Sequence, residues 1–243
     1  MDYLTVFIMR LLGLWNNLKP FEIDLHKAEN KEMWKKYLML HTDRFIEDQG
    51  ELGDFKYGKK SLDFITKSTV GSAFIHKDGS IAGRANLCGI VAIYNACVSL
   101  GAGRSRVAFA SIIENFERKG LLLNGCMGTS PRAILNFLKS LGFDTKLFYA
   151  GDLNTERFKE VQESFEAFIY VAYNSAKHIK NGMHFICVTK DSSGGFVPHN
   201  SQGGLSESRY GDLENAVRAY NDYKSKPICV IGIKNVSPGQ LSS

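Results

Sequence analysis

The pattern of apolar and polar positions changes along the chain near residue 80. Residues 22–47 carry apolar residues among many charges, which predicts an amphipathic helix or helix pair. Residues 48–86 are less regular, and glycines at 50, 53, 58, 71, 79 and 83 mark turns between short strand-like pieces. We therefore expect residues 1–80 to form a mostly helical N-terminal extension or cap and residues 81–243 to form the main domain.

From residue 87 onward the pattern predicts helices first and strands afterwards. Residues 88–100 are apolar on nearly every side, as a central buried helix would be, and Gly101 to Gly103 end that helix. A hydroxyl followed by proline in Thr129-Ser-Pro131 predicts another helix start. In all, we expect further helices at about 107–118, 131–141, 154–164 and 211–223, and strands at 146–149, 167–173, 184–190, 195–199 and 227–234. This order indicates an α+β fold in which the central helix packs on an antiparallel sheet.

Composition and charge exclude several classes of protein. The 243 residues are 44% hydrophobic, which is ordinary for a globular chain. The net charge of +5 comes from 30 basic and 25 acidic residues spread along the sequence, so it indicates solubility and at most a mild preference for anionic partners. No arginine-rich run or paired zinc-ligand spacing occurs in the sequence, and we expect no nucleic-acid partner, no cofactor and no metal.

The cysteines indicate a reducing compartment. Their number, five, is odd, and their spacing shows no close pairs. Disulfides are rare in reducing compartments, so we expect a cytoplasmic protein with unpaired thiols. The cysteines are Cys88, Cys97, Cys126, Cys187 and Cys229.

The apolar N-terminus raises the question of a targeting segment. Asp2 stands where a secretory signal has positive charge, and Arg10 interrupts the apolar run, so we do not expect a signal peptide. The run is also shorter than the roughly 20 residues needed to cross a bilayer, and no transmembrane segment is expected. Its apolar residues fall at helical spacing, which predicts a helix that packs on the domain or on a partner, with a membrane-surface helix as the alternative. They are Leu4, Phe7, Ile8, Leu11, Leu12 and Trp15.

Cys88 is the candidate nucleophile, because it stands at the start of the predicted central helix. A thiol attacks a carbonyl carbon as thiolate, and unpaired N–H groups at a helix start lower a cysteine pKa. Gly89 is expected to keep the approach to the sulfur open, and Asn86 is expected to cap the helix. The other cysteines fall within helices, apolar strands or a glycine-rich loop. The alternative is that Cys88 is a buried core residue.

His184 is the candidate base, and Asn200 is the candidate residue that orients it. If the turn between the two last predicted hairpin strands is centred on Ser192, His184 lies directly opposite Asn200, with Cβ atoms about 5 Å apart. The asparagine oxygen then accepts the imidazole N–H, and the other ring nitrogen faces the thiol. Alternatively, His184 is a satisfied strand histidine and Asn200 a loop residue. His199 is the second choice as base and is expected to point away from Cys88.

Four segments together resemble the papain-like cysteine peptidases. They are Asn86-Leu-Cys-Gly-Ile-Val-Ala-Ile-Tyr-Asn95, Gly128-Thr-Ser-Pro-Arg-Ala-Ile-Leu-Asn-Phe-Leu-Lys-Ser-Leu-Gly142, Met183-His-Phe-Ile-Cys-Val-Thr189 and Pro198-His-Asn-Ser-Gln202. Within these peptidases the chain is most similar to the type that removes double-glycine leaders from bacteriocins. The resemblance spans about residues 85–235. It implies a papain-like domain over 81–243, a peptide or protein substrate, and a triad of Cys88, His184 and Asn200.

One position departs from the family pattern, and it affects the expected activity. The family usually has a glutamine about six residues before the cysteine, to complete the oxyanion hole, whereas this chain has Ala82. We expect the hole to use the Cys88 N–H with the Asn86 side chain, or else to be incomplete, which costs on the order of 10²-fold in rate. The resemblance therefore implies thiol-dependent hydrolysis of a peptide or amide bond. The alternatives are acyl transfer or deamidation with the same triad, and an inactive papain-like module that binds peptides.

Overall fold

A computed structural model gives an α+β fold, as the sequence predicts, with a five-stranded antiparallel sheet in the order β1-β5-β2-β3-β4. The strands are β1 (Phe143–Tyr149), β2 (Ala167–Tyr173), β3 (Met183–Lys190), β4 (Phe196–His199) and β5 (Lys226–Asn235). The helices are α2 (Ala28–Leu38), α5 (Cys88–Ser99), α6 (Phe109–Lys119), α7 (Pro131–Ser140), η4 (Ala150–Asp152), α8 (Glu156–Gln162) and α9 (Leu213–Ala219). The structure describes residues 4, 7–8, 28–39, 44–47, 87–101, 107–119, 129–153, 155–173, 183–199, 208–219 and 226–236.

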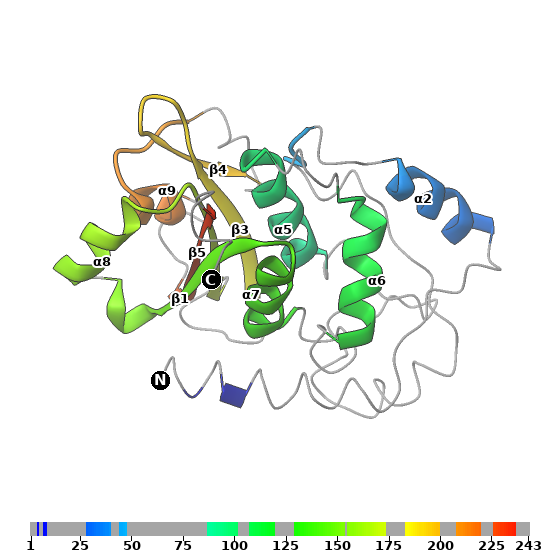
Figure 1. Ribbon diagram of the computed structural model, residues 1–243, viewed down its shortest axis with the longest axis horizontal. Helices are drawn as coiled ribbons and strands as arrows, with labels where there is room; N and C mark the ends of the chain where they lie inside the picture. Colours follow the sequence, from blue (N-terminus) through cyan, green and yellow to red (C-terminus); the bar gives the residue numbers. More distant parts are fainter. Residues whose placement is uncertain are drawn as a thin grey trace.

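Helices cover both faces of the sheet. Figure 1 shows α5 and α7 on one face and α8 and α9 on the other, while α6 lies outside α5 and α2 lies beyond α6. Two apolar clusters fill the layers, one between the sheet and α5, the other under α8 and α9. In β2, Ile169 and Val171 face α5, whereas Phe168 and Tyr170 face α9. The strand is buried on both sides, which explains its uninterrupted apolar sequence.

The central helix α5 matches the sequence prediction in extent and burial. Its residues from Cys88 to Cys97 are all buried, and Gly101, with φ of 55°, follows its end. The predicted entry of α7 is also confirmed, since the Ser130 side chain accepts a hydrogen bond of 3.4 Å from the Ala133 N–H and Pro131 begins the helix. Local hydrogen bonding therefore sets the start of α7 where the sequence indicates.

Strand β1 begins earlier than its apolar residues predict. It pairs with β5 along its whole length, from Phe143↔Asn235 to Tyr149↔Cys229. Main-chain pairing does not depend on side-chain polarity, so the ladder also recruits Asp144 and Thr145. Helix α8 is shorter than predicted, α9 begins two residues later than predicted, and η4 lies where no helix is expected.

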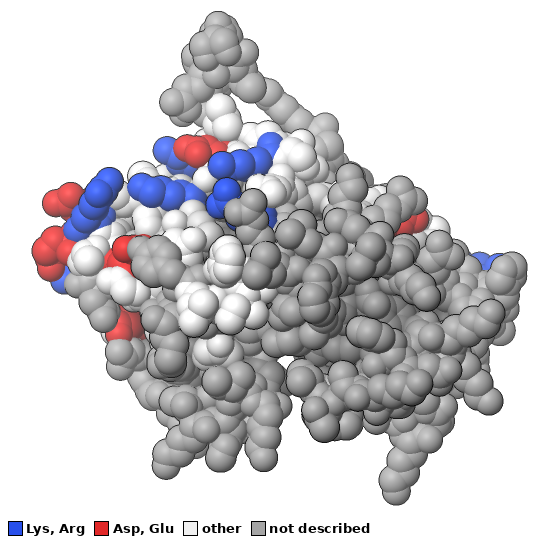
Figure 2. Space-filling view, turned by 90° about the horizontal axis from the view of Figure 1, so that it is seen from below, with Lys and Arg blue, Asp and Glu red and all other residues white. Residues whose placement is uncertain are grey.

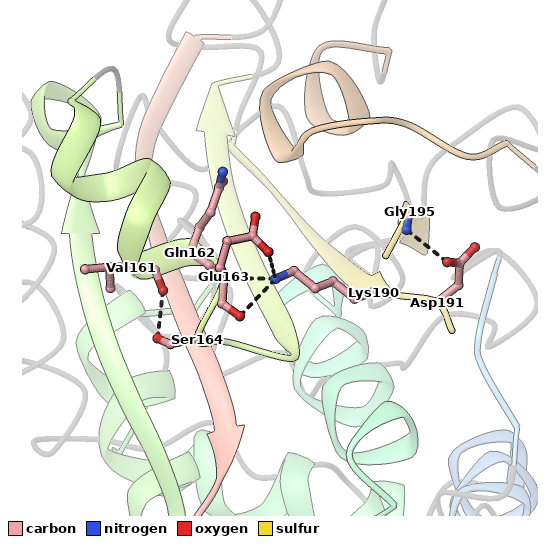
Figure 3. Close-up of polar contacts among 7 residues, drawn as sticks. All are labelled: Val161, Gln162, Glu163, Ser164, Lys190, Asp191 and Gly195. Carbon is pink, nitrogen blue, oxygen red and sulfur yellow. Dashed lines mark hydrogen bonds and ion pairs between the residues drawn. The ribbon is translucent and has the colours of Figure 1, made fainter. Parts of the chain in front are cut away.

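The turn between β3 and β4 is held by Asp191. Its Oδ1 accepts hydrogen bonds of 2.9 Å from the N–H groups of Ser193 and Gly195, of which Figure 3 shows the one from Gly195, and Gly194 takes a φ of 83°. The Ser193 hydroxyl also donates to Oδ1, at 2.6 Å, and these bonds, that of the hydroxyl above all, lower the pKa of Asp191. Next to the turn, Lys190 Nζ donates to the carbonyl oxygens of Gln162 at 3.1 Å and of Glu163 at 3.3 Å (Figure 3). A cation at the end of α8 is favourable, so Lys190 joins this hairpin to that helix.

Parts of the N-terminal 80 residues pack against the rest of the chain. Tyr37 of α2 is fully buried and meets the Phe109 ring of α6 edge-on, with centroids 5.1 Å apart. Ile46 is also buried and exchanges two hydrogen bonds with the Asn95 side chain of α5. The expected boundary near residue 80 lies outside the described residues. Residues 28–39 and 44–47 nevertheless contribute to the core shared with α5 and α6.

Leu4, Phe7 and Ile8 of the apolar N-terminal run are helical and exposed. The other apolar positions of that run lie outside the described residues. None of the helices found among the described residues has the length and apolarity needed to cross a membrane. On the face drawn in Figure 2, basic side chains gather on the described surface with acidic side chains among and beside them.

Candidate functional site

Cys88 is the first residue of α5, as predicted, and it is buried. Its exposed fraction is 2%, and Leu87 takes the position before it without making a side-chain cap. Asn86 is the expected helix cap, and the residue directly before the helix is Leu87. Asn86 itself lies outside the described residues. The first N–H groups of α5 therefore receive no side-chain cap from Leu87.

The Cys88 sulfur reaches the edge of β3 at Phe185, the residue that follows His184. The backbone N–H of Phe185 acts on the thiol as a hydrogen-bond donor. The Lys190 N–H donates to the Glu166 carbonyl oxygen on the β2 side, and the next N–H, that of Asp191, donates to the Gly195 carbonyl oxygen on the β4 side. Since N–H groups alternate in direction along a strand, the odd-numbered residues of β3 direct theirs toward β4. The described pairs with β4 end at Cys187↔His199. The sulfur thus lies on the β4 side of β3, beyond that last pair.

Burial raises the pKa of Cys88 to about 11, although the N–H groups of Phe185, Gly89 and Cys88 itself lower it. The expectation of a lowered pKa at the helix start is therefore wrong. Removing the thiolate from water costs more than the nearby N–H groups return. In this structure the thiol is protonated at neutral pH.

His184 lies in β3, one residue from the peptide that Cys88 contacts, and its exposed fraction is 5%. It pairs with Ala172 of β2, whose side chain belongs to the apolar cluster under α9, as does that of Ile186. Because side chains alternate between the two faces along a strand, the His184 side chain leaves the main chain on the face opposite α5. The structure brings Cys88 close to the main chain beside His184. The sulfur lies on the α5 side of β3, whereas the His184 side chain leaves the strand on the other side.

The register assumed for Asn200 is wrong by two residues. The observed pairs run from Lys190↔Phe196 to Cys187↔His199 and are centred on Ser193, not Ser192. The cause is the turn held by Asp191, which closes with a hydrogen bond from Asp191 N–H to the Gly195 carbonyl oxygen. Asn200 lies outside the described residues. A shift of two residues keeps each position on its face, so the hydrophobic pattern does not distinguish the two registers.

His199 is on the α5 face of the sheet, and the expectation that it points away from that side is wrong. It pairs with Cys187, which belongs to the α5 cluster. Its Nε2 lies 2.9 Å from Thr189 Oγ1 and its Nδ1 lies 2.8 Å from Glu47 Oε1. The Phe45 ring stacks on it with centroids 3.9 Å apart. Both ring nitrogens are therefore engaged, Nε2 with the neighbouring strand β3 and Nδ1 with Glu47, and the imidazole helps to hold residues 44–47 against the sheet.

Gly89 has a different role from the one the sequence indicates. A Cβ placed there would lie 2.5 Å from Oγ1 and 2.6 Å from Cβ of Thr129. The glycine admits the Thr129 side chain against the start of α5 rather than opening a path to the sulfur. Sequence reasoning treated Thr129 only as part of a helix entry, because its neighbour in space is forty positions away in the chain.

Comparison of the chain with family models, with curated proteins and with solved structures gave no match. Among the described residues, no group of three or more histidines, cysteines and carboxylates is arranged to hold a metal ion.

Proposed function

We propose that the chain is a papain-like thiol hydrolase that cleaves a peptide or amide bond, with Cys88 as nucleophile, His184 as base and Asn200 as the orienting residue. The observation that carries this proposal is that Cys88 begins the buried helix α5, which packs on β3, the strand that carries His184. The α+β fold, in which the buried helix α5 packs on an antiparallel sheet, supports it.

The reaction needs each of the three groups in turn. The Cys88 proton passes to the His184 imidazole while the sulfur bonds to the substrate carbonyl carbon. The C–N bond then breaks, and the imidazolium gives its proton to the leaving amine, so that a thioester remains on Cys88. Water next gives a proton to His184 and attacks the thioester carbonyl. The sulfur leaves as thiolate and takes the proton back, and the acid is released.

The raised pKa makes the base essential. With a pKa of about 11, on the order of one Cys88 thiol in ten thousand is ionised at pH 7. Attack therefore depends on transfer of the proton to His184 as the substrate binds. Since the imidazole starts on the opposite face of β3, its side chain has to reach the sulfur around the strand edge at Phe185.

A second candidate function is an inactive papain-like module that binds peptides. The 2% exposure of Cys88 and its raised pKa favour it, because both are ordinary for a core cysteine. In that case the start of α5 would accept a peptide without forming a thioester. The two candidates predict different reactivities for the same sulfur.

Alkylation by iodoacetamide at pH 6, followed by mass spectrometry of each cysteine peptide, separates them. A hydrolase predicts that Cys88 reacts about tenfold or more faster than the buried Cys97, Cys187 and Cys229. His184→Gln should remove that advantage. His199→Gln is the matched control, since it alters another buried histidine of the same hairpin and should leave the advantage in place. Similar rates at Cys88 and at these three buried cysteines in the unaltered chain would favour the binding module.

Cleavage itself is tested with an unbiased peptide library analysed by mass spectrometry. New peptide ends that disappear with Cys88→Ala indicate hydrolysis. Masses that show an amine joined to the acyl fragment would indicate acyl transfer instead. Peptides that bind without any mass change, equally to the unaltered chain and to Cys88→Ala, would contradict the proposal.

A further inference from the structure

The hydroxyl of Thr129 is buried beside the candidate nucleophile without a partner. Thr129 has no exposed surface, and within the described part of the chain its Oγ1 has no hydrogen-bond partner. Its side chain packs directly on Gly89, the residue after Cys88. A buried unpaired hydroxyl costs about 1–3 kcal/mol, and a valine of the same shape would avoid that cost. The position of this hydroxyl therefore suggests a ligand that accepts its hydrogen bond.

The surroundings of Thr129 Oγ1 suit a negatively charged oxygen. Among the residues described at the start of α5, Leu87 gives the first N–H groups of this helix no side-chain cap. The N–H groups of Cys88 and Gly89 both act on the Cys88 sulfur. Donors at a helix start favour anions. The carbonyl oxygen of an acyl group that is bonded to the sulfur would lie among the same N–H groups.

We propose that Thr129 donates a hydrogen bond to the oxyanion that forms when the Cys88 sulfur attacks an acyl carbonyl. This rests on the proposed function and extends it. As the C–S bond forms, the carbonyl π electrons move to the oxygen, which accepts hydrogen bonds from the Thr129 hydroxyl and the Cys88 N–H. The hydroxyl keeps its proton throughout. Thr129 thus supplies the side-chain donor that Ala82 cannot offer, and the substrate class is any ester, thioester or amide that reaches the sulfur.

Two small reagents separate this role from a general effect on the thiol. Acylation of Cys88 by p-nitrophenyl acetate passes through an oxyanion, whereas alkylation by iodoacetamide displaces iodide from a saturated carbon and forms none. In Thr129→Val we expect acylation to fall by about 10- to 100-fold while alkylation changes by no more than about twofold. Thr129→Ser keeps the hydroxyl and should acylate within a fewfold of the unaltered chain.

Thr145→Val is the matched control. Thr145 on β1 is the other buried threonine with an unpaired hydroxyl among the described residues, and its strand packs against α7. Thr145→Val should change neither the acylation rate nor the alkylation rate of Cys88. Thermal unfolding of Thr129→Val should give a Tm equal to or above that of the unaltered chain, because no hydrogen bond is lost.

Three results would overturn the inference. They are an unchanged acylation rate in Thr129→Val, an equal fall of acylation and alkylation, and a clearly lowered Tm that identifies a structural partner for the hydroxyl. An unaltered chain whose Cys88 reacts with neither reagent contradicts the proposed function and this extension together. Normal reactivity of Cys88 with no effect of Thr129→Val contradicts only the role of Thr129.

Discussion

Asn95 of α5 holds residues 44–47 against the main domain, and its replacement tests whether this part of the N-terminal extension belongs to the fold. The side chain is fully buried. Its Oδ1 accepts a 2.8 Å hydrogen bond from Ile46 N–H, and its Nδ2 donates a 2.9 Å bond to the Ile46 carbonyl oxygen. Asn95→Ala removes both bonds and leaves the two main-chain groups of Ile46 without their partner.

The expected cost follows from two limits. If residues 44–47 stay in place, two buried unpaired groups cost about 1–3 kcal/mol each. If the segment detaches, the loss is limited to the contacts it makes. The largest of these is burial of the Ile46 side chain, worth about 1.5–3 kcal/mol, followed by the contacts of Phe45 and Glu47 with His199. We expect Asn95→Ala to lower the free energy of unfolding by about 2–4 kcal/mol.

Urea unfolding followed by circular dichroism measures the change, and the slope distinguishes the two limits. A lower midpoint with an unchanged slope means that the segment stays docked, whereas a smaller slope means that the native state already exposes it. Amide hydrogen exchange of the peptide that contains Ile46 should accelerate in both cases. Asn136→Ala, on the exposed face of α7, is the control and should change stability by less than about 0.5 kcal/mol. Equal effects of the two substitutions would refute this account of Asn95.

Three further predictions concern the start of α5 and the buried hydroxyls. Gly89→Ala places a Cβ 2.5 Å from Thr129 Oγ1 and should cost about 1–3 kcal/mol in thermal unfolding, whereas Gly151→Ala, with open space around it, should cost less than about 0.5 kcal/mol. Because the pKa of Cys88 is about 11 in the fold against 9.0 when exposed, the folded state binds more protons between those values. The contribution of Cys88 should therefore be retained below pH 9 and fall by about 2–3 kcal/mol as the pH rises to 11, in addition to the losses from Cys97 and Cys187, whose pKa values burial also raises. Cys88→Ala should reduce the total fall in denaturation curves by about that amount. Thr145→Val should leave stability unchanged or raise it by about 1 kcal/mol, and a marked loss would reveal a partner for its hydroxyl.

The sequence alone determined the elements and their order. The apolar run from Cys88, the Ser130-Pro131 entry and the uninterrupted apolar strand 167–173 predicted α5, α7 and β2. These predictions succeeded because helix starts and strand alternation depend on hydrogen bonds and side chains a few residues apart. The same locality placed Cys88 at a helix start and His184 in a strand. The triad of Cys88, His184 and Asn200 remains a proposal built on those positions.

Only the tertiary structure decided which groups meet and in what environment. The β3–β4 register depends on how Asp191 closes its turn, and a shift of two residues leaves the apolar alternation unchanged, so the sequence pattern does not reveal it. The direction of the Cys88 pKa shift depends on desolvation by elements far away in the chain, which outweighs the local N–H groups. The contact of Thr129 with Gly89 likewise exists only after α5 and the segment before α7 have packed together. Burial and register are properties of the packed chain, whereas helix starts and strand alternation are properties of neighbouring residues.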